Sequence, residues 1–150
     1  MTYFTGEGTF DNRLQIAEFT ISGSPSQGQY FTLSSANIDS FDSGTLPTGG
    51  GTDTLSFSAG SYFFRAFFDV TRSSANHNFQ FKFEVNSTLA GAFGQTNLYG
   101  NLKYDGAEVP FKSSSNFNLK LKCIGIEGSA PSLTSNSKIF VWRIAWVIHQ

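Results

Sequence analysis

Apolar and polar residues alternate with a period of two along most of the chain, and no window has the spacing of an amphipathic helix. In Asn78–Val85 the alternation is clean, with the Phe residues and Val85 on one face and Gln80, Lys82 and Glu84 on the other. Stretches rich in Gly, Ser and Pro separate such runs. The pattern predicts short strands at 14–21, 30–33, 55–57, 62–71, 78–85, 98–103, 109–112, 117–123 and 139–148.

Three details qualify this prediction. A change of phase is expected within the first strand, near Ala17–Phe19, where two apolar positions become adjacent. The residues 42–54 and 128–137 are polar and are predicted to be long loops. Pro110 interrupts the strand at 109–112, which suits an edge strand or a bulge. Many short strands without crossover helices predict an all-β sandwich or barrel.

Two of the expected strands carry apolar residues on both faces. In 62–71 one face holds Tyr62, Phe64, Ala66, Phe68 and Val70, and the other holds Phe63, Arg65, Phe67 and Asp69. The strand 139–148 is apolar on both faces and is broken only by Arg143. A sandwich strand normally buries one face and wets the other, and soluble monomers rarely expose large apolar patches. We therefore expect self-association, with the loop 42–54 or the N-terminal segment as the alternative cover.

Length, charge and cysteine content narrow the class of protein. The 150 residues suit a single domain, with 1–13 as an N-terminal segment and 14–148 as the sandwich. The net charge is −1 and the cationic residues are scattered, so no nucleic-acid partner is expected. Cys123 is the single cysteine, which excludes an intrachain disulfide. Neither a signal peptide nor a membrane-spanning stretch is recognisable, so synthesis in the cytoplasm without membrane insertion is expected.

Two segments resemble a known family. The run Leu55-Ser56-Phe57-Ser58-Ala59-Gly60-Ser61-Tyr62-Phe63-Phe64-Arg65-Ala66 is similar to the L-x-x-x-A-G-x-Y-x-x-x-A stretch of C1q/TNF-like jelly-roll domains. The closing Ile139-Phe140-Val141-Trp142-Arg143-Ile144 resembles their aromatic final strand. The resemblance covers 14–148 in layout and implies a two-sheet antiparallel jelly roll that assembles as a homotrimer. The chain departs from the family by continuing with residues 145–150 beyond the usual end.

The resemblance also implies a function. Domains of this kind are common in bacteriophage tail fibres and spikes, where they serve as terminal heads for attachment to a host. On this basis the protein is expected to be displayed on the surface of a virion. Its expected partners are further copies of itself, a glycan or protein of the host cell surface, and other virion proteins.

Candidate catalytic and metal-binding groups are sparse. His77 and His149 lack the nucleophile and orienting group of a catalytic triad. Asp39-Ser40-Phe41-Asp42 offers oxygen ligands for Ca²⁺, but a turn explains it better. Asn86-Ser87-Thr88 matches an N-glycosylation acceptor, relevant only in a secreted eukaryotic protein. We expect no enzymatic activity, cofactor or metal. The acidic residues on expected strands, with no pair predicted to converge as a glycosidase requires, are Glu18, Glu84 and Glu127.

A binding surface is predicted at one end of the sandwich. If 61–71, 78–87, 97–103, 108–112, 116–127 and 138–148 are consecutive antiparallel strands, loops 71–78, 104–107 and 128–137 fall at the end opposite the C-terminus. Tyr104-Asp105-Gly106 is a turn signal within one of these loops. Loops presented on a rigid scaffold are a frequent binding design. The predicted binding residues are Arg72, Asn76, His77, Tyr104 and Asp105.

Three function classes remain open at this point. The first is a receptor-binding head domain that attaches a virus or phage to its host. The second is a structural protein of the virion, in the capsid, as a decoration or in tail assembly. The third, and least favoured, is a polysaccharide hydrolase, because it needs a converging pair of carboxylates that the sequence does not indicate.

Overall fold

The computed structural model describes residues 9–39, 50–71, 78–95, 102–106, 108–127 and 132–149. Within these ranges the chain forms strands and no helix, so no helical membrane span is found there, and the all-β prediction is confirmed. The strands are β1 (Thr9–Ser22), β2 (Thr32–Asp39), β3 (Gly50–Thr52), β4 (Leu55–Phe57), β5 (Gly60–Thr71), β6 (Asn78–Val85), β7 (Thr88–Gln95), β8 (Leu102–Asp105), β9 (Val109–Ser113), β10 (Phe117–Glu127), β11 (Ser132–Leu133) and β12 (Lys138–His149).

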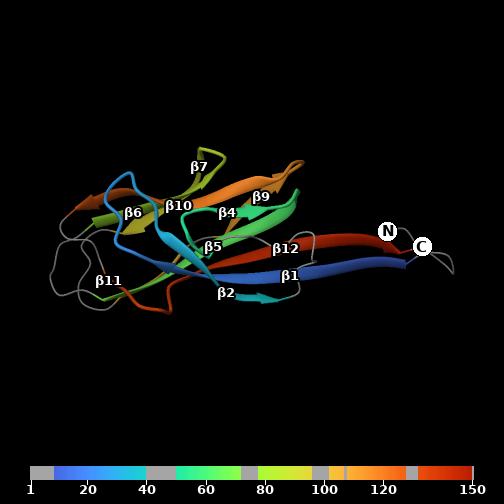
Figure 1. The fold of residues 1–150 in the computed structure, drawn as a ribbon, viewed down its shortest axis with the longest axis horizontal. Helices are drawn as coiled ribbons and strands as arrows, with labels where there is room; N and C mark the ends of the chain where they lie inside the picture. Colours follow the sequence, from blue (N-terminus) through green and yellow to red (C-terminus); the bar gives the residue numbers. More distant parts are fainter. Residues whose placement is uncertain are drawn as a thin grey trace.

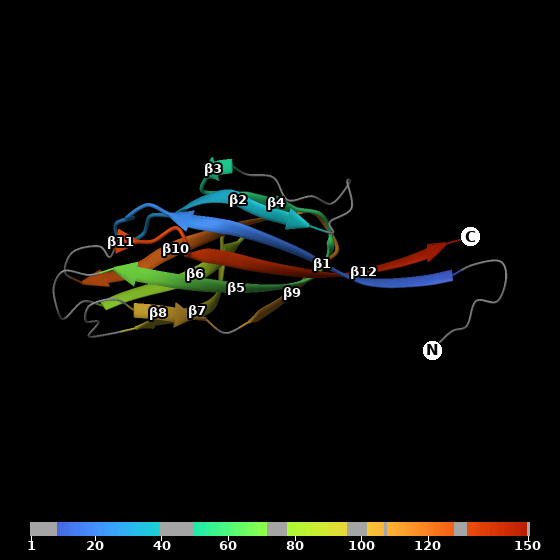
Figure 2. The same cartoon turned by 90° about the horizontal axis from the view of Figure 1, so that it is seen from below.

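The strands form two antiparallel sheets that stack as layers (Figures 1 and 2). Sheet A has the order β11-β5-β12-β1-β2-β3, and β8 and β9 also pair with β5. Sheet B has the order β4-β10-β6-β7. This is the two-sheet antiparallel sandwich that the alternation predicted. β9, which contains Pro110, pairs only with β5 and lies at the edge of sheet A as expected.

Aromatic rings from both sheets fill the interior. Phe64 is fully buried and lies between the sheets, with its ring centroid 5.8 Å from Phe57, 5.9 Å from Phe83 and 6.1 Å from Phe117. Ring pairs at these separations add to the stabilisation gained from apolar burial. The division of 62–71 into two faces is confirmed, because residues 62, 64, 66, 68 and 70 of β5 are all buried, and the odd-numbered residues 117–123 of β10 pack against them in the interior.

The first strand differs from the prediction. Its faces alternate without interruption from Gln15 to Ile21, so the expected change of phase is wrong. Instead Gln15 is buried in the sandwich and Ile16 lies outside, 39% exposed. The irregularity is in the pairing with β2, where Glu18 lies opposite Asn37 and Phe19 opposite Ser35. One extra residue of β2, Ala36, is therefore accommodated as a bulge.

Several boundaries also differ. β3 lies within the stretch 42–54 that was predicted to be a loop, and β7 was not predicted because Gly91 and Gly94 weaken its pattern. The strand expected at 30–33 begins only at Thr32, while Tyr30 makes an isolated bridge to Lys122 in the other sheet. Of the strand expected at 98–103, the described part begins at Leu102.

β1 and β12 pair from Thr9 opposite His149 to Thr20 opposite Lys138. Their outer ends project beyond the other strands as a two-stranded ribbon (Figures 1 and 2). The ribbon end of the sandwich also carries the β4–β5 connection, the β6–β7 turn and the start of β10, whereas β5 and β10 end at the opposite side. Because these three segments lie at the same end of the sandwich, their side chains can contribute to one site.

Phe64 provides a direct test of the core. Replacing Phe64 with Ala removes a ring that no solvent reaches and leaves a cavity among its aromatic neighbours. We expect the free energy of unfolding to fall by about 3–5 kcal/mol, measured by urea denaturation at fixed protein concentration. The exposed loop variant Gln27→Ala is the control and is expected to change stability by less than about 0.5 kcal/mol. Equal effects of the two substitutions would contradict this account of the core.

Candidate functional site

The side of sheet A that faces away from sheet B, here called the outer face of sheet A, is rich in aromatic residues. Trp142 of β12 lies opposite Ile16 of β1 on one side and opposite Phe63 of β5 on the other. These side chains keep part of their surface accessible, and Ile16 is the exposed large hydrophobic residue of the described chain. The prediction that these two strands are apolar on both faces is confirmed for 62–70 of β5 and 139–144 of β12, where the side chains are described. The outer face comprises Ile16, Glu18, Phe63, Arg65, Phe67, Lys138, Phe140, Trp142 and Ile144.

Charged groups lie among the aromatic residues of this face. The Arg65 guanidinium carbon is 5.2 Å from the ring centroid of Phe140 and 5.3 Å from that of Trp142. Lys138 and Glu18 form an ion pair with Nζ 3.6 Å from Oε2. A central patch of aromatic residues and arginine with an ion pair beside it has the composition of a protein–protein interface.

The outer face is also hollowed beside β9. A hollow of about 340 Å³ has Phe63, Pro110 and Ile144 among its lining residues. The alternative cover for this face, the loop 42–54 or the N-terminal segment, falls mostly on residues outside the described ranges. The hollow offers a place for an apolar side chain of a partner.

Arg143 breaks the apolar run of β12 because it points into the sandwich rather than out of it. Its Nη1 donates to Gln15 Oε1 at 3.1 Å and its Nη2 donates to the Ala59 carbonyl at 3.2 Å. Its guanidinium carbon lies 5.7 Å from the ring centroid of Tyr62. Gln15 is therefore buried as the acceptor for this guanidinium, which explains the inverted polarity at the start of β1.

Gly60, at the start of β5, allows this approach. A Cβ at position 60 would lie 2.9 Å from Arg143 Nε, which is closer than side-chain atoms normally come. Gly60 has φ +157°, a backbone conformation that residues with a side chain rarely adopt. The Ala59-Gly60 turn thus brings the β4–β5 connection against the buried guanidinium.

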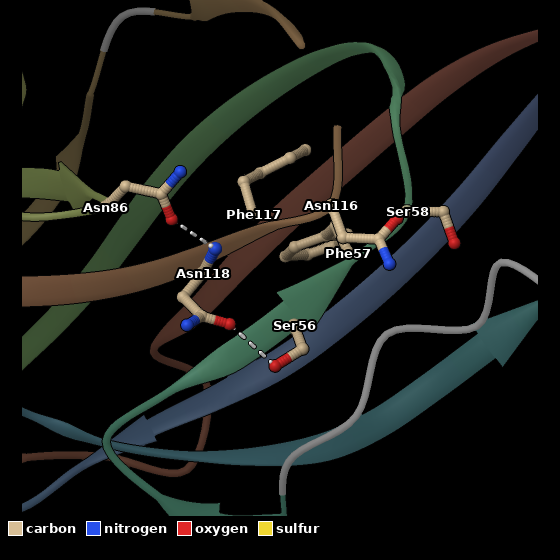
Figure 3. Close-up of a pocket in the computed structure, with 7 residues that line it drawn as sticks. All are labelled: Ser56, Phe57, Ser58, Asn86, Asn116, Phe117 and Asn118. Carbon is tan, nitrogen blue, oxygen red and sulfur yellow. Dashed lines mark hydrogen bonds between the residues drawn. The ribbon is translucent and has the colours of Figure 1, made fainter. Parts of the chain in front are cut away.

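A second hollow, of about 400 Å³, lies at the ribbon end of sheet B (Figure 3). It is here called the asparagine hollow. Two stacked rings, Phe57 and Phe117, with centroids 5.4 Å apart, line it together with short polar side chains. The residues come from β4, the β4–β5 connection, the β6–β7 turn and the start of β10. They are Ser56, Phe57, Ser58, Asn86, Asn116, Phe117 and Asn118.

Hydrogen bonds hold the asparagine side chains in place. Asn86 Oδ1 accepts from the Asn118 backbone N–H at 2.9 Å, and Asn118 Oδ1 accepts from the Ser56 hydroxyl at 2.8 Å (Figure 3). Asn116 Oδ1 accepts from the Ala59 N–H at 3.3 Å. Each asparagine thus uses its carbonyl oxygen to join neighbouring turns. The amide orientation of Asn86 and Asn116 is set because a backbone N–H can only donate.

The β6–β7 turn has special backbone geometry. Asn86 has φ 45° and Ser87 has φ 72°, so both central residues of this two-residue hairpin lie in the left-handed region. That is the requirement of the hairpin turn whose twist matches the flanking strands, and Asn is well suited to it. Asn86-Ser87-Thr88 also matches a glycosylation acceptor, and the signal for a turn was Asn86 directly after the alternating run 78–85.

Sheet B carries a polar cluster on its own outer face. Tyr30 donates its hydroxyl to Glu84 Oε2 at 2.7 Å, and Glu84 Oε1 lies 3.7 Å from Lys122 Nζ. Lys120 Nζ lies 4.5 Å from the Tyr30 ring centroid and 3.9 Å from Asp53. Lys120 and Lys122 are both held in this network. It fastens the β1–β2 connection onto β10.

The predicted binding residues are only partly placed. Arg72, Asn76 and His77 lie outside the described residues, so the prediction for them stays untested. Tyr104 and Asp105 lie in β8, opposite Phe68 and Phe67 of β5, and the turn predicted for them is wrong.

The physical reason is that β8 and β9 are not successive antiparallel partners. Both run antiparallel to β5 and so run in the same direction, with residues 106–108 between them. The connection between β8 and β9 therefore lies along the edge of sheet A rather than at the end opposite the C-terminus. A binding role for Tyr104 and Asp105 remains a prediction.

The acidic candidates are also placed. Glu18 lies on the outer face of sheet A and Glu84 on the outer face of sheet B, so these two carboxylates point away from each other. The side chain of Glu127 and most of the candidate calcium loop at 39–42 fall outside what the structure describes. Glu18 and Glu84 each pair with a lysine, which makes them structural rather than a converging acid–base pair.

Comparison with known proteins clarifies the fold. No family model matches the chain, and no curated protein matches it in sequence. Solved structures do match, among them the crystal structure of murine APRIL, a TNF-family protein, with a TM-score of 0.57. That similarity covers 87% of this chain and 99% of APRIL at 8% sequence identity. The chain has a TNF-like jelly-roll fold. At this identity the likeness concerns the fold alone.

Two tyrosines are expected to titrate late. The hydrogen bond to Glu84, followed by burial, raises the pKa of Tyr30 above its ordinary value, and burial raises the pKa of Tyr62 against the opposing effect of Arg143. A raised tyrosine pKa favours the neutral phenol in the folded state. The stability that these groups contribute is complete below pH of about 10 and is lost as the pH rises through the folded-state pKa values.

Phenolate absorbance during alkaline titration measures this effect. We expect the late-titrating part of the curve to shrink in Tyr30→Phe and again in Tyr62→Phe. A titration in which every tyrosine of the native protein ionises at the unfolded value, before unfolding begins, would contradict it.

Proposed function

We propose that the chain is a non-enzymatic binding module, a homotrimeric receptor-binding head of a viral or phage fibre or spike. The observation that carries the proposal is the aromatic outer face of sheet A, on the central strands β5 and β12. On this proposal the protein is displayed on the virion surface and binds a glycan or protein of the host cell. Support comes from the TNF-like jelly-roll fold and the resemblance of 55–66 to C1q/TNF-like domains.

Self-association is favoured by the physical chemistry of this face. Phe63, Trp142 and Ile16 lie in one row across three strands, and burying them against another copy removes apolar surface from water. The Arg65 guanidinium already lies over two aromatic rings. It therefore keeps these cation–π contacts when association removes the water around it. A ring of three copies requires complementary surfaces on each copy, and we propose the aromatic row and the hollow beside Pro110, which adjoin at Phe63, as these surfaces.

Binding is favoured over catalysis by the placement of the titratable groups. Glu18 and Glu84 are on opposite outer faces and each is engaged by a lysine. A glycosidase needs two carboxylates a few ångströms apart across one bond. A structural role in the virion would use the same aromatic face against a different virion protein, and copy number per particle separates that case from an attachment head.

The assembly is tested with Phe63→Asp, which places a charge in the centre of the aromatic row. We expect light scattering to give the mass of three chains for the native protein and a smaller mass for the variant, because an unpaired charge cannot be buried cheaply. Gln80→Asp, an exposed position on sheet B, is the matched control and should keep the native mass. A native protein that is a stable monomer would overturn the proposed assembly.

Attachment is tested by adsorption of the isolated chain to cells and to a glycan array. We expect the native assembly to adsorb to its host, and Phe63→Asp to adsorb about a hundredfold or more weakly because single sites lack avidity. Gln80→Asp should adsorb like the native protein. An intact trimer that adsorbs to no candidate host surface would refute the attachment role.

A further inference from the structure

We infer that the asparagine hollow is a binding site for a neutral sugar, which extends the proposed attachment function and rests on it. The hollow lies on elements of sheet B, whereas the proposed trimer interface is on the outer face of sheet A. Assembly through sheet A therefore leaves the hollow open. It also lies at the ribbon end of the sandwich, away from the loops that the sequence favoured.

Hydrogen-bond donors in the hollow are prepared but unused. The carbonyl oxygens of Asn86, Asn116 and Asn118 each accept a hydrogen bond from a neighbouring turn. Their amide nitrogens have no hydrogen-bond partner within the described part of the chain. Because the oxygen of each amide is tethered, its NH₂ group is held in place and offers two donors to a ligand. Little side-chain freedom is then lost on binding.

The chemistry of the lining selects the class of ligand. Its polar side chains are amides and hydroxyls, and no Asp, Glu, Lys or Arg is among the lining residues. A charged ligand such as a sialic acid or a sulfate would lose water without gaining an opposite charge. A neutral sugar presents ring and hydroxyl oxygens as acceptors, and its hydroxyl protons can be accepted by the Ser56 oxygen, whose own proton goes to Asn118. Its C–H groups would meet the small part of Phe57 and Phe117 that stays accessible in the lining of the hollow.

Size and rigidity agree with this assignment. The volume of about 400 Å³ is at the small end of ligand pockets, which suits one or two sugar rings. Phe57 and Phe117 are both 2% exposed and are anchored in the core, so this part of the lining does not move. The Asn86-Ser87 turn is fixed by its left-handed backbone and by reciprocal bonds, since the Asn86 N–H also donates to the Asn118 carbonyl at 3.1 Å.

The test measures binding of methyl glycosides of glucose, galactose, mannose and N-acetylglucosamine to the full assembled chain by saturation-transfer NMR. Sialic acid, glucuronate and inorganic sulfate are measured alongside. The double variant Asn116→Ala/Asn118→Ala removes two tethered amides, and Asn86→Gly removes the third while keeping a residue that tolerates the turn. Asn136→Ala, an exposed asparagine with its own side-chain hydrogen bond to Asp69, is the matched control.

We expect at least one neutral sugar to bind, the double variant to weaken it about tenfold or more, and Asn136→Ala to leave it unchanged. Thermal unfolding of each variant establishes that it is folded. Binding that is equal in the double variant, or absent for all neutral sugars, overturns the inference. A preference for the anionic ligands overturns the assignment to neutral sugars.

The two proposals fail in different ways. If the native protein adsorbs to cells but its sugar binding is absent or is equal in the double variant, the attachment function stands and the sugar site is wrong. If the double variant loses sugar binding but the native protein adsorbs to no cell, the sugar site stands and the attachment function is wrong.

Discussion

Successive side chains of an extended strand point to opposite faces, and on β5 and β12 this constraint decides most of what the molecule can do. Both strands have paired neighbours on each side in sheet A, so their backbones cannot rotate to bury the second face. One set of side chains, with Phe64 at its centre, joins the aromatic interior. The other set, which includes Phe63 and Trp142, is left on the outside. An outer face of this composition favours association. The paired strands fix these aromatic side chains on one surface, so they are buried from water only when another surface covers them.

The aromatic interior also determines the end of the sandwich where the turns meet. Phe57 and Phe117 stack at the edge of the core, directly beneath the β4–β5 connection and the start of β10. Because these rings are buried, the backbone that carries them is fixed, and the asparagines between the turns are held by it. Side-chain amides tethered to backbone N–H groups are costly to rearrange, which is what a preorganised polar site requires.

Strand faces could be predicted from sequence where alternation was clean, as in β6, whose Phe81, Phe83 and Val85 are buried. The change of phase expected near Ala17–Phe19 was wrong because the inward orientation of Gln15 depends on Arg143, a residue of the last strand that needs an acceptor inside the sandwich. β7 was missed because Gly91 and Gly94 carry no face preference. The asparagine hollow could not be foreseen, since it joins three turns that are distant in the chain, and only the Asn86-Ser87 hairpin had a local signal.

The two sheets differ in what they offer to a partner. The outer face of sheet A is mainly aromatic, whereas the outer face of sheet B carries the network of Tyr30, Glu84 and two lysines. That network satisfies its own charges internally and holds the β1–β2 connection, so it has little free energy to gain from a partner. The association that we propose through sheet A and the recognition that we propose at the ribbon end of sheet B therefore do not compete. A head domain that must assemble and bind at the same time needs that separation, because each bound copy then adds to the avidity of the others.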